Sequence, residues 1–187
     1  MNRKFSPFEK IKTLEYTNVS VVFLFNKHQE VLLQHRDDKI NIVHPNIWGP
    51  LGGHCNLNET PYECAIREMK EETDYICKDL YWDDNYVLPY KDKKEYLVNK
   101  DKKKYLVSVF WDMYDGVQKI KCLEGQSIEF ISLSNLEKYN ILSHSLIMIN
   151  KIIEILKKKE LSILFIIFLL PFILLIHEGL IFFISSF

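Results

Sequence analysis

The sequence is organised around the stretch from Gly53 to Tyr75, GHCNLNETPYECAIREMKEETDY. Within it, Thr60 and Glu63 have the spacing of a capping box, and Pro61 stands at the first helical position, where its missing amide is not needed. We therefore expect a helix from Pro61 to about Thr73. An apolar stripe at helical spacing would bury one side of this helix: Tyr62, Ala65, Ile66 and Met69.

Three glutamates, Glu68, Glu71 and Glu72, share one face of this expected helix because they are three and four residues apart. Like charges at that spacing repel by about 0.2–0.5 kcal/mol per pair, and the C-terminal half of a helix disfavours anions. Glu63 can pair with Arg67, which leaves the three carboxylates without a partner in the helix. Two interpretations are open: an acidic solvated face, which is common, or a site for a hard cation such as Mg²⁺, which takes oxygen ligands.

The flanking residues favour the cation site, because the stretch resembles the Nudix box of the Nudix hydrolases. That box reads Gly, five residues, Glu, seven residues, Arg-Glu, apolar, any, Glu-Glu, any, Gly, apolar. Asp74 departs from it by standing where the family has a glycine that ends the helix in the left-handed conformation, and this should cost about 1 kcal/mol. The matching positions are Gly53, Glu59, Arg67, Glu68, Met69, Glu71, Glu72 and Tyr75.

The resemblance covers about residues 18–158 and implies an α+β fold. In that fold, an α/β/α sandwich, a mixed central sheet lies between helices and the box forms a loop–helix–loop at the cleft. Apolar, β-rich runs agree with strands over 19–25 and 31–36, paired as a hairpin, an extended segment over 81–88 and a buried strand over 105–111. The lysine-rich residues 91–104 fit a solvated hairpin, or alternatively a basic loop near the phosphates.

The resemblance also assigns the metal ligands. Glu68, Glu71 and Glu72 would hold the ion together with the carbonyl of Gly52. A further ligand, Glu124, comes from the Glu-Gly-Gln triplet at 124–126, which resembles MutT-type members of the family, with Glu129 as the alternative. The ion expected is Mg²⁺, with Mn²⁺ as a possible substitute.

Other residues receive catalytic or supporting roles. The general base would be Glu68, with Glu71 next, and Arg67 would orient the glutamates by charge-assisted hydrogen bonds. Gly53 and Glu59 would support the box loop. Two substrate contacts are considered, and each has a simpler explanation: Trp48 beside a glycine turn is more often a core residue, and His144 follows Ser143, which can cap the last helix.

The activity implied is hydrolysis of a nucleoside diphosphate linked to a moiety X. The MutT-like triplet favours a nucleoside triphosphate, including an oxidised purine, split into a monophosphate and pyrophosphate. ADP-ribose or another sugar nucleotide is the nearest competitor. Outside hydrolysis, an isomerase of isoprenoid diphosphates would need a cysteine and glutamate constellation that is not evident, and a non-catalytic nucleotide-binding module would be expected to have lost box carboxylates.

Composition limits the other classes of function. The 187 residues allow one domain and an appendage, and a net charge of −1 argues against stable nucleic-acid binding through bulk electrostatics. Four cysteines show no paired metal spacing and are expected to be reduced thiols of an intracellular domain. The sequence does not indicate an oligomeric state.

Three regions follow from these patterns: a lead-in over 1–17, the Nudix domain over 18–158 and a hydrophobic tail over 160–187. Residues 161–187 are long enough to cross a membrane, which takes about 20 residues, although Glu178 would cost about 2.5–3.5 kcal/mol inside one. Lysines upstream would keep the catalytic domain on the cytoplasmic side. We expect an apolar C-terminal helix that serves as a membrane anchor. An interfacial hairpin, a buried oligomer contact or a tail with no evolved role remain open.

Overall fold

The structure is a computed structural model that describes residues 6–11, 16–40, 42, 44–89 and 104–162. The chain forms two compact units, Met1–Met148 and Ile149–Phe187. The first unit contains the sheet, the box and the cavity described below. In the second unit, the described residues continue a helix that covers 143–162, close to the start expected from Ser143.

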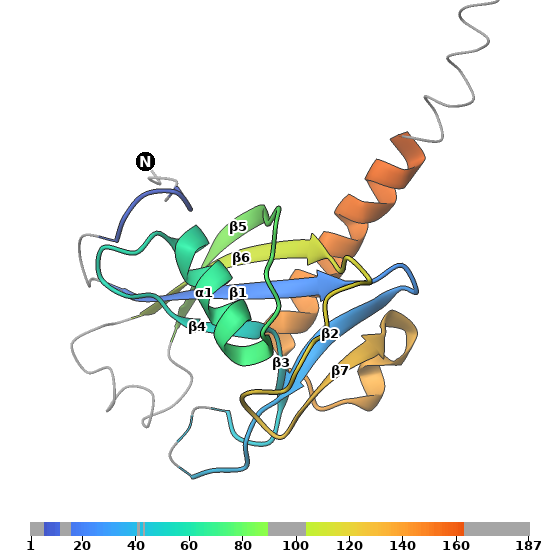
Figure 1. The fold of residues 1–187 in the computed structure, drawn as a ribbon, viewed down its shortest axis with the longest axis horizontal. Coiled ribbons are helices and arrows are strands. Elements are labelled where there is room, and N and C mark those ends of the chain that lie inside the picture. Colours follow the sequence, from blue (N-terminus) through green and yellow to red (C-terminus); the bar gives the residue numbers. More distant parts are fainter. Residues whose placement is uncertain (1–5, 12–15, 41, 43, 90–103, 163–187) are drawn as a thin grey trace, which may run out of the picture. The chain divides into compact units, whose positions relative to one another are not determined.

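Seven strands of the first unit form one sheet with the order β3-β2-β1-β6-β5, in which β4 pairs with β1 and β7 with β2 (Figure 1). β1 and β6 are parallel, and the other five pairs are antiparallel, so the predicted mixed sheet is confirmed. The strands are β1 Thr17–Phe25, β2 Glu30–His35, β3 Trp48–Gly49, β4 Leu51–His54, β5 Tyr81–Pro89, β6 Lys104–Met113 and β7 Ser127–Ser132.

The predicted hairpin between the first two strands is confirmed. Leu24 of β1 lies opposite Leu32 of β2 in antiparallel register. Asn26 shapes the turn, since its side-chain oxygen accepts from the amides of His28 at 2.9 Å and of Glu30 at 3.2 Å. This turn fixes the register of β2, whose far end leads into the loop that borders the cavity.

The box helix α1 spans Pro61–Thr73 and begins with the predicted capping box. The Glu63 amide donates to Thr60 Oγ1 at 3.1 Å, and the Thr60 amide donates to Glu63 Oε2 at 2.8 Å. The helix ends at Asp74, which has the left-handed φ of 59° that the family's glycine would adopt there. Its amide donates to the carbonyl of Lys70 at 2.9 Å, so the aspartate closes the helix despite its side chain.

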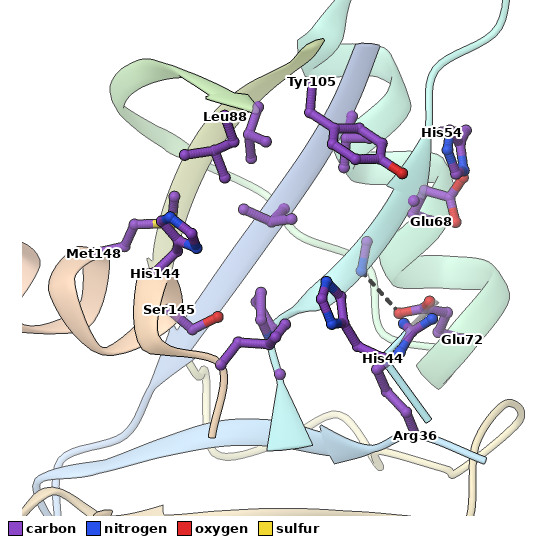
Figure 2. A pocket seen from close by; sticks show the side chains of 18 of the residues that line it. Arg36, His44, His54, Glu68, Glu72, Leu88, Tyr105, His144, Ser145 and Met148 are labelled. Carbon is purple, nitrogen blue, oxygen red and sulfur yellow. Dashed lines mark hydrogen bonds between the residues drawn. The ribbon is translucent and has the colours of Figure 1, made fainter. Parts of the chain in front are cut away.

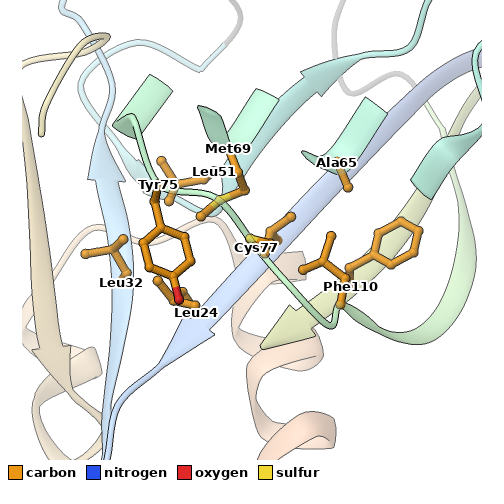
Figure 3. Close-up of a cluster of buried hydrophobic side chains, with 10 residues drawn as sticks. Leu24, Leu32, Leu51, Ala65, Met69, Tyr75, Cys77 and Phe110 are labelled. Carbon is orange, nitrogen blue, oxygen red and sulfur yellow. The ribbon is translucent and has the colours of Figure 1, made fainter. Parts of the chain in front are cut away.

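A cluster of buried side chains fixes α1 against β1, β2, β4 and β6 (Figure 3). Ala65 and Met69 of the predicted stripe are buried, and Tyr62 and Ile66 pack against the cluster while half-buried. This burial determines the rotation of α1 about its axis and so the face that its glutamates occupy. The buried members are Val22, Leu24, Leu32, Leu51, Ala65, Met69, Tyr75, Cys77, Leu80 and Phe110.

A 3-10 helix, η1, spans Leu133–Lys138 and follows β7. Several predictions lie outside the described residues: the tail from 163 onward, most of the lysine-rich segment over 91–104, and parts of the lead-in. Within the residues that the structure describes, no helix has both the length and the apolar character that a membrane crossing requires.

Candidate active site

A cavity of about 460 Å³ opens beside the box in the first unit (Figure 2). In Figure 2, Glu68 and Glu72 of α1 face it from one side, and His144, Ser145 and Met148 face it from the other. Of the residues predicted from the sequence to form a site, those in the lining are Gly52, Gly53, Glu68, Glu72, Glu124 and His144.

Glu68 occupies its position because residue 53 has no side chain. A Cβ added at Gly53 would lie 2.6 Å from Oε2 of Glu68 and 2.8 Å from its Cδ. The glycine of the box therefore leaves room for the carboxylate. Burial raises the pKa of Glu68, the Arg67 guanidinium opposes this, and the negative charges of Glu71 and Glu124 add to the rise.

Glu72 is the most buried carboxylate of the lining, with 4% of its surface exposed. Its Oε2 accepts the amide of Gly52 at 2.9 Å. Burial raises its pKa to about 8; the Gly52 amide opposes this, the negative charges of Glu124 and Glu68 reinforce it, and Arg36 opposes it weakly. The charges of these three carboxylates therefore repel one another across the cavity that they line.

This donor set fits a hard divalent cation, because it consists of oxygen atoms whose mutual repulsion a cation would relieve. Glu68, Glu72 and Glu124 would hold such an ion, with the carbonyl of Gly52 beside them. Among the described residues, however, no three His, Cys, Asp or Glu side chains are already gathered closely enough to form a metal site. The ligand assignment therefore stays a prediction.

Arg67 binds three carboxylates of the box rather than the expected Glu63. Its Nε donates to Oε1 of Glu59 at 2.8 Å, and its Nη1 donates to Oε1 of Glu68 at 2.7 Å and to Oε2 of Glu71 at 2.9 Å. Glu63 is engaged in the capping box instead. Two of the three glutamates that we expected to lack a partner in the helix therefore share one guanidinium, and these contacts would let Arg67 orient them.

Glu59 and His54 extend this network into the box loop. Arg67 Nη2 donates to Oε2 of Glu59 at 3.1 Å and to the carbonyl of His54 at 3.0 Å. Burial alone would raise the pKa of Glu59, but hydrogen bonds from Arg67 and from the Asn56 amide outweigh it and hold that pKa below its usual range. The loop between β4 and α1 is thus fastened to the helix by charge-assisted bonds.

Besides Glu59, four predicted residues are not in the lining, as far as the described residues go. The side chain of Glu71 is 59% exposed and pairs with Arg67, and Glu129 is an exposed residue of β7. The ring of Trp48 stacks on His35 at 4.7 Å and meets Tyr139 edge-on at 5.4 Å, but the residue is half-buried and is not one of the buried core residues. Arg67, the fourth, contacts the carboxylate of Glu68, which does line the cavity.

The lining also contains residues that the sequence analysis did not single out: Arg36, His44, His54 and Tyr105. Figure 2 shows Arg36 and His44 on the side of Glu72, and Tyr105 with its hydroxyl directed toward Glu68. Only one feature of the sequence pointed to Arg36 as a site residue: it is a cation at the end of a β-rich run. Tyr105 enters the site only because β6 lies beside β1.

Apolar side chains form much of the remaining cavity wall. Val19 and Val21 of β1 and Val107 of β6 form part of it, together with Leu142 and Met148. The cavity therefore combines an acidic end beside α1 with an apolar surface that suits a flat ring.

A family model described as NUDIX domain matches residues 15–147. Curated relatives include the m7GpppN-mRNA hydrolase NUDT17 of Xenopus laevis, 40% identical over 55 residues, and that of Danio rerio, 36% identical over 73 residues. These matches cover 29% and 35% of this chain but only 18% and 24% of the relatives' own lengths.

Solved structures are similar in fold. The NUDIX domain of Shewanella oneidensis NrtR, complexed with ADP ribose, has a TM-score of 0.62 at 15% identity and covers 75% of this chain and 88% of that one. A C. elegans Ap4A hydrolase has a TM-score of 0.59 at 20% identity and covers 76% of this chain and 98% of its own. With the family model matching most of the chain and the box lying beside the cavity, the chain belongs to the Nudix domain family.

Proposed function

We propose that this protein hydrolyses a phosphoric anhydride in a nucleoside diphosphate linked to a further group X. The observation that carries the proposal is the composition of one cavity. Its acidic end holds Glu68, Glu72 and Glu124, and its remaining wall is largely apolar. Such a wall accommodates a nucleoside, while carboxylates beside it suit a cation-bound diphosphate.

A bound Mg²⁺, for which Mn²⁺ could substitute, would screen the charge of the phosphates and stabilise the leaving phosphate. The chain itself would supply the general base, and Glu68 is our first choice because it lines the cavity and its pKa is raised by burial. Glu71 is the second choice. Arg67 holds both carboxylates and would keep Glu68 oriented while a proton is transferred.

A nucleoside triphosphate, including one with an oxidised purine, is our first candidate substrate, giving a monophosphate and pyrophosphate. The Glu-Gly-Gln triplet at 124–126 supports it. A capped dinucleotide of the m7GpppN type is the second candidate, because the curated relatives that match are named m7GpppN-mRNA hydrolases. ADP-ribose and other sugar nucleotides are the third group.

The test is product analysis on a panel of 8-oxo-dGTP, dGTP, m7GpppG and ADP-ribose with Mg²⁺. Pyrophosphate release from the triphosphates would support the first candidate, and a nucleoside diphosphate product from m7GpppG the second. Glu72→Gln should lower kcat/KM on the order of 10²-fold or more. The matched control is Glu137→Gln, an exposed residue of η1, which should leave the rate unchanged.

Two outcomes would count against this account. Tight binding of a nucleotide without turnover would favour the non-catalytic module. Equal rates for wild type and Glu72→Gln would remove the metal-ligand assignment. Separately, a rate loss in Glu129→Gln that is absent from Glu124→Gln would assign to Glu129 the ligand role proposed for Glu124.

A further inference from the structure

Two cysteines, Cys55 and Cys64, meet where the box loop joins α1. Their thiol groups lie close enough for each to shift the pKa of the other. Cys55 Sγ lies 3.3 Å from the hydroxyl of Ser20, and Cys64 Sγ donates to the carbonyl of Gly53 at 3.8 Å. The Ser20 hydroxyl also donates to the carbonyl of Pro61, in the first turn of α1, at 2.7 Å. Both thiols therefore belong to one buried contact among β1, the loop and the helix.

The two sulfurs differ in access and in charge. Cys55 is half-buried, whereas Cys64 is fully buried. The interaction between the two thiols lowers the pKa of Cys55 and raises that of Cys64. For Cys55, burial opposes this shift, and the positive charge of Arg67 supports it. The Arg67 Nη2 also lies 3.7 Å from Cys64 Sγ. The more accessible sulfur, that of Cys55, is thus the one that ionises more readily.

We propose that Cys55 and Cys64 are a redox-active dithiol that a low-molecular-weight disulfide converts into an intramolecular disulfide. The Cys55 thiolate attacks glutathione disulfide and releases one glutathione thiolate, leaving a mixed disulfide on Cys55. Cys64 then loses its proton and displaces the second glutathione, forming the Cys55–Cys64 bond. Overall, two protein thiols lose two electrons and two protons, and one glutathione disulfide becomes two glutathiones.

The bond would close the box loop onto the first turn of α1. The loop and helix already meet there through Arg67, Glu59 and the carbonyl of His54. A bridge at this point restrains the unfolded chain and should raise the thermal midpoint by several degrees in a protein of this size. This inference does not depend on the proposed hydrolysis, since neither the bond nor the midpoint requires a substrate.

The test uses the full-length protein, equilibrated in a series of glutathione and glutathione disulfide ratios, quenched with acid and alkylated with N-ethylmaleimide after denaturation. Trypsin then releases residues 40–67 as one peptide, because no lysine or arginine lies between Lys39 and Arg67. This peptide contains Cys55 and Cys64 and no other cysteine. We expect it to change from two maleimide groups to none as the ratio becomes more oxidising, following a two-electron dependence.

The remaining cysteines provide the control. Cys77 is buried, and burial raises its pKa to about 12, while Cys122 is exposed and its Sγ contacts the carbonyl of Glu124 at 3.2 Å. The double variant Cys77→Ala/Cys122→Ser should keep the transition at the same ratio. If that variant does not fold, the 40–67 peptide of the wild-type protein still tests whether Cys55 and Cys64 form a disulfide. Two maleimide groups at every ratio, or a stable glutathione adduct on Cys55 without a bridge, would overturn the proposal.

Discussion

The side chain of Glu72 is buried, although the negative charges of Glu68 and Glu124 lie near it. Its folded pKa of about 8 lies above the ordinary 4.5, so the folded metal-free protein binds a proton that the unfolded chain releases. The stability that this proton contributes is complete below pH 4.5 and is lost as the pH rises to about 8. The stability lost between pH 4.5 and 8 is on the order of a few kcal/mol.

In metal-free buffer, Glu72→Gln should therefore have a thermal midpoint that depends less on pH between 5 and 8 than the wild type has. It should also be the more stable protein at pH 8. Mg²⁺ affinity of the wild type, measured by calorimetry, should rise over the same interval because the ion competes with the proton. Parallel pH profiles for the two proteins would contradict the raised pKa.

Gly52 and Gly53 are neighbours with different reasons to be glycine. Gly52 has φ of +127°, and a Cβ there would lie 2.1 Å from the backbone oxygen of Ser20, so Gly52→Ala should lower the free energy of unfolding by roughly 2–4 kcal/mol. At Gly53 the obstacle is the movable end of Glu68. Gly53→Ala should therefore fold with a midpoint close to that of the wild type but lose activity.

Urea denaturation and turnover of both variants check this pair of expectations. Unchanged activity in a folded Gly53→Ala would show that the position of Glu68 is not needed for turnover. An unaltered free energy of unfolding in Gly52→Ala would contradict the clash with the Ser20 carbonyl described for that position.

Among single residues, the sequence predicted those whose role depends on local spacing. Glu68 and Glu72 lie in the cavity because the helix and its buried stripe place them there. Arg36 and Tyr105 could not be predicted in the same way. Arg36 follows β2 and Tyr105 lies in β6, and these strands come together with the box only in the folded sheet.

At the level of secondary-structure elements, the end of α1 carries a measurable strain. Asp74 has the left-handed φ of 59° and pairs with Lys121 through its exposed carboxylate. Asp74→Gly should raise the free energy of unfolding by about 1 kcal/mol from the backbone, less the small contribution of an exposed ion pair. Asp74→Asn removes the charge but tolerates the conformation, and so isolates the ion pair.

Chemical denaturation of the wild type, Asp74→Gly and Asp74→Asn measures the backbone contribution and the ion-pair contribution to stability. The expected order of stability is Asp74→Gly above Asp74→Asn, with the wild type close to the latter. A glycine variant less stable than the wild type would mean that the contact with Lys121 outweighs the backbone term.

The elements themselves were largely predictable where the signal is local. The capping box located the start of α1, and the β-rich runs located β1, β2 and β6. The two-residue strand β3 and the short β4 were not predicted as strands, since their glycines and proline give no alternating pattern. Their strand character comes from pairing with β2 and β1.

For the whole molecule, the open question that the sequence raises concerns residues 161–187. We infer from their apolar composition that they attach the protein to a membrane with the catalytic unit on the cytoplasmic side. After cell lysis without detergent and high-speed centrifugation, the full-length chain should be found in the membrane pellet, and a chain ending at residue 160 in the supernatant. Recovery of the full-length chain in the supernatant would show that the tail is no anchor.

The sheet topology could be predicted only from the resemblance to the Nudix hydrolases. The parallel pairing of β1 with β6 joins residues that are almost ninety positions apart, and no local pattern specifies such a contact. The same applies to the cavity, which collects residues from Val19 to Met148.

That span has a consequence for synthesis on the ribosome. The carboxylates of α1 emerge early, but Ser145 and Met148, which complete the far wall, are translated last among the cavity's residues. A nascent chain that stops before Leu142 would contain the whole acidic helix and still lack one side of the cavity. Premature termination there would leave a protein that presents its anionic box to solvent with an incomplete compartment beside it.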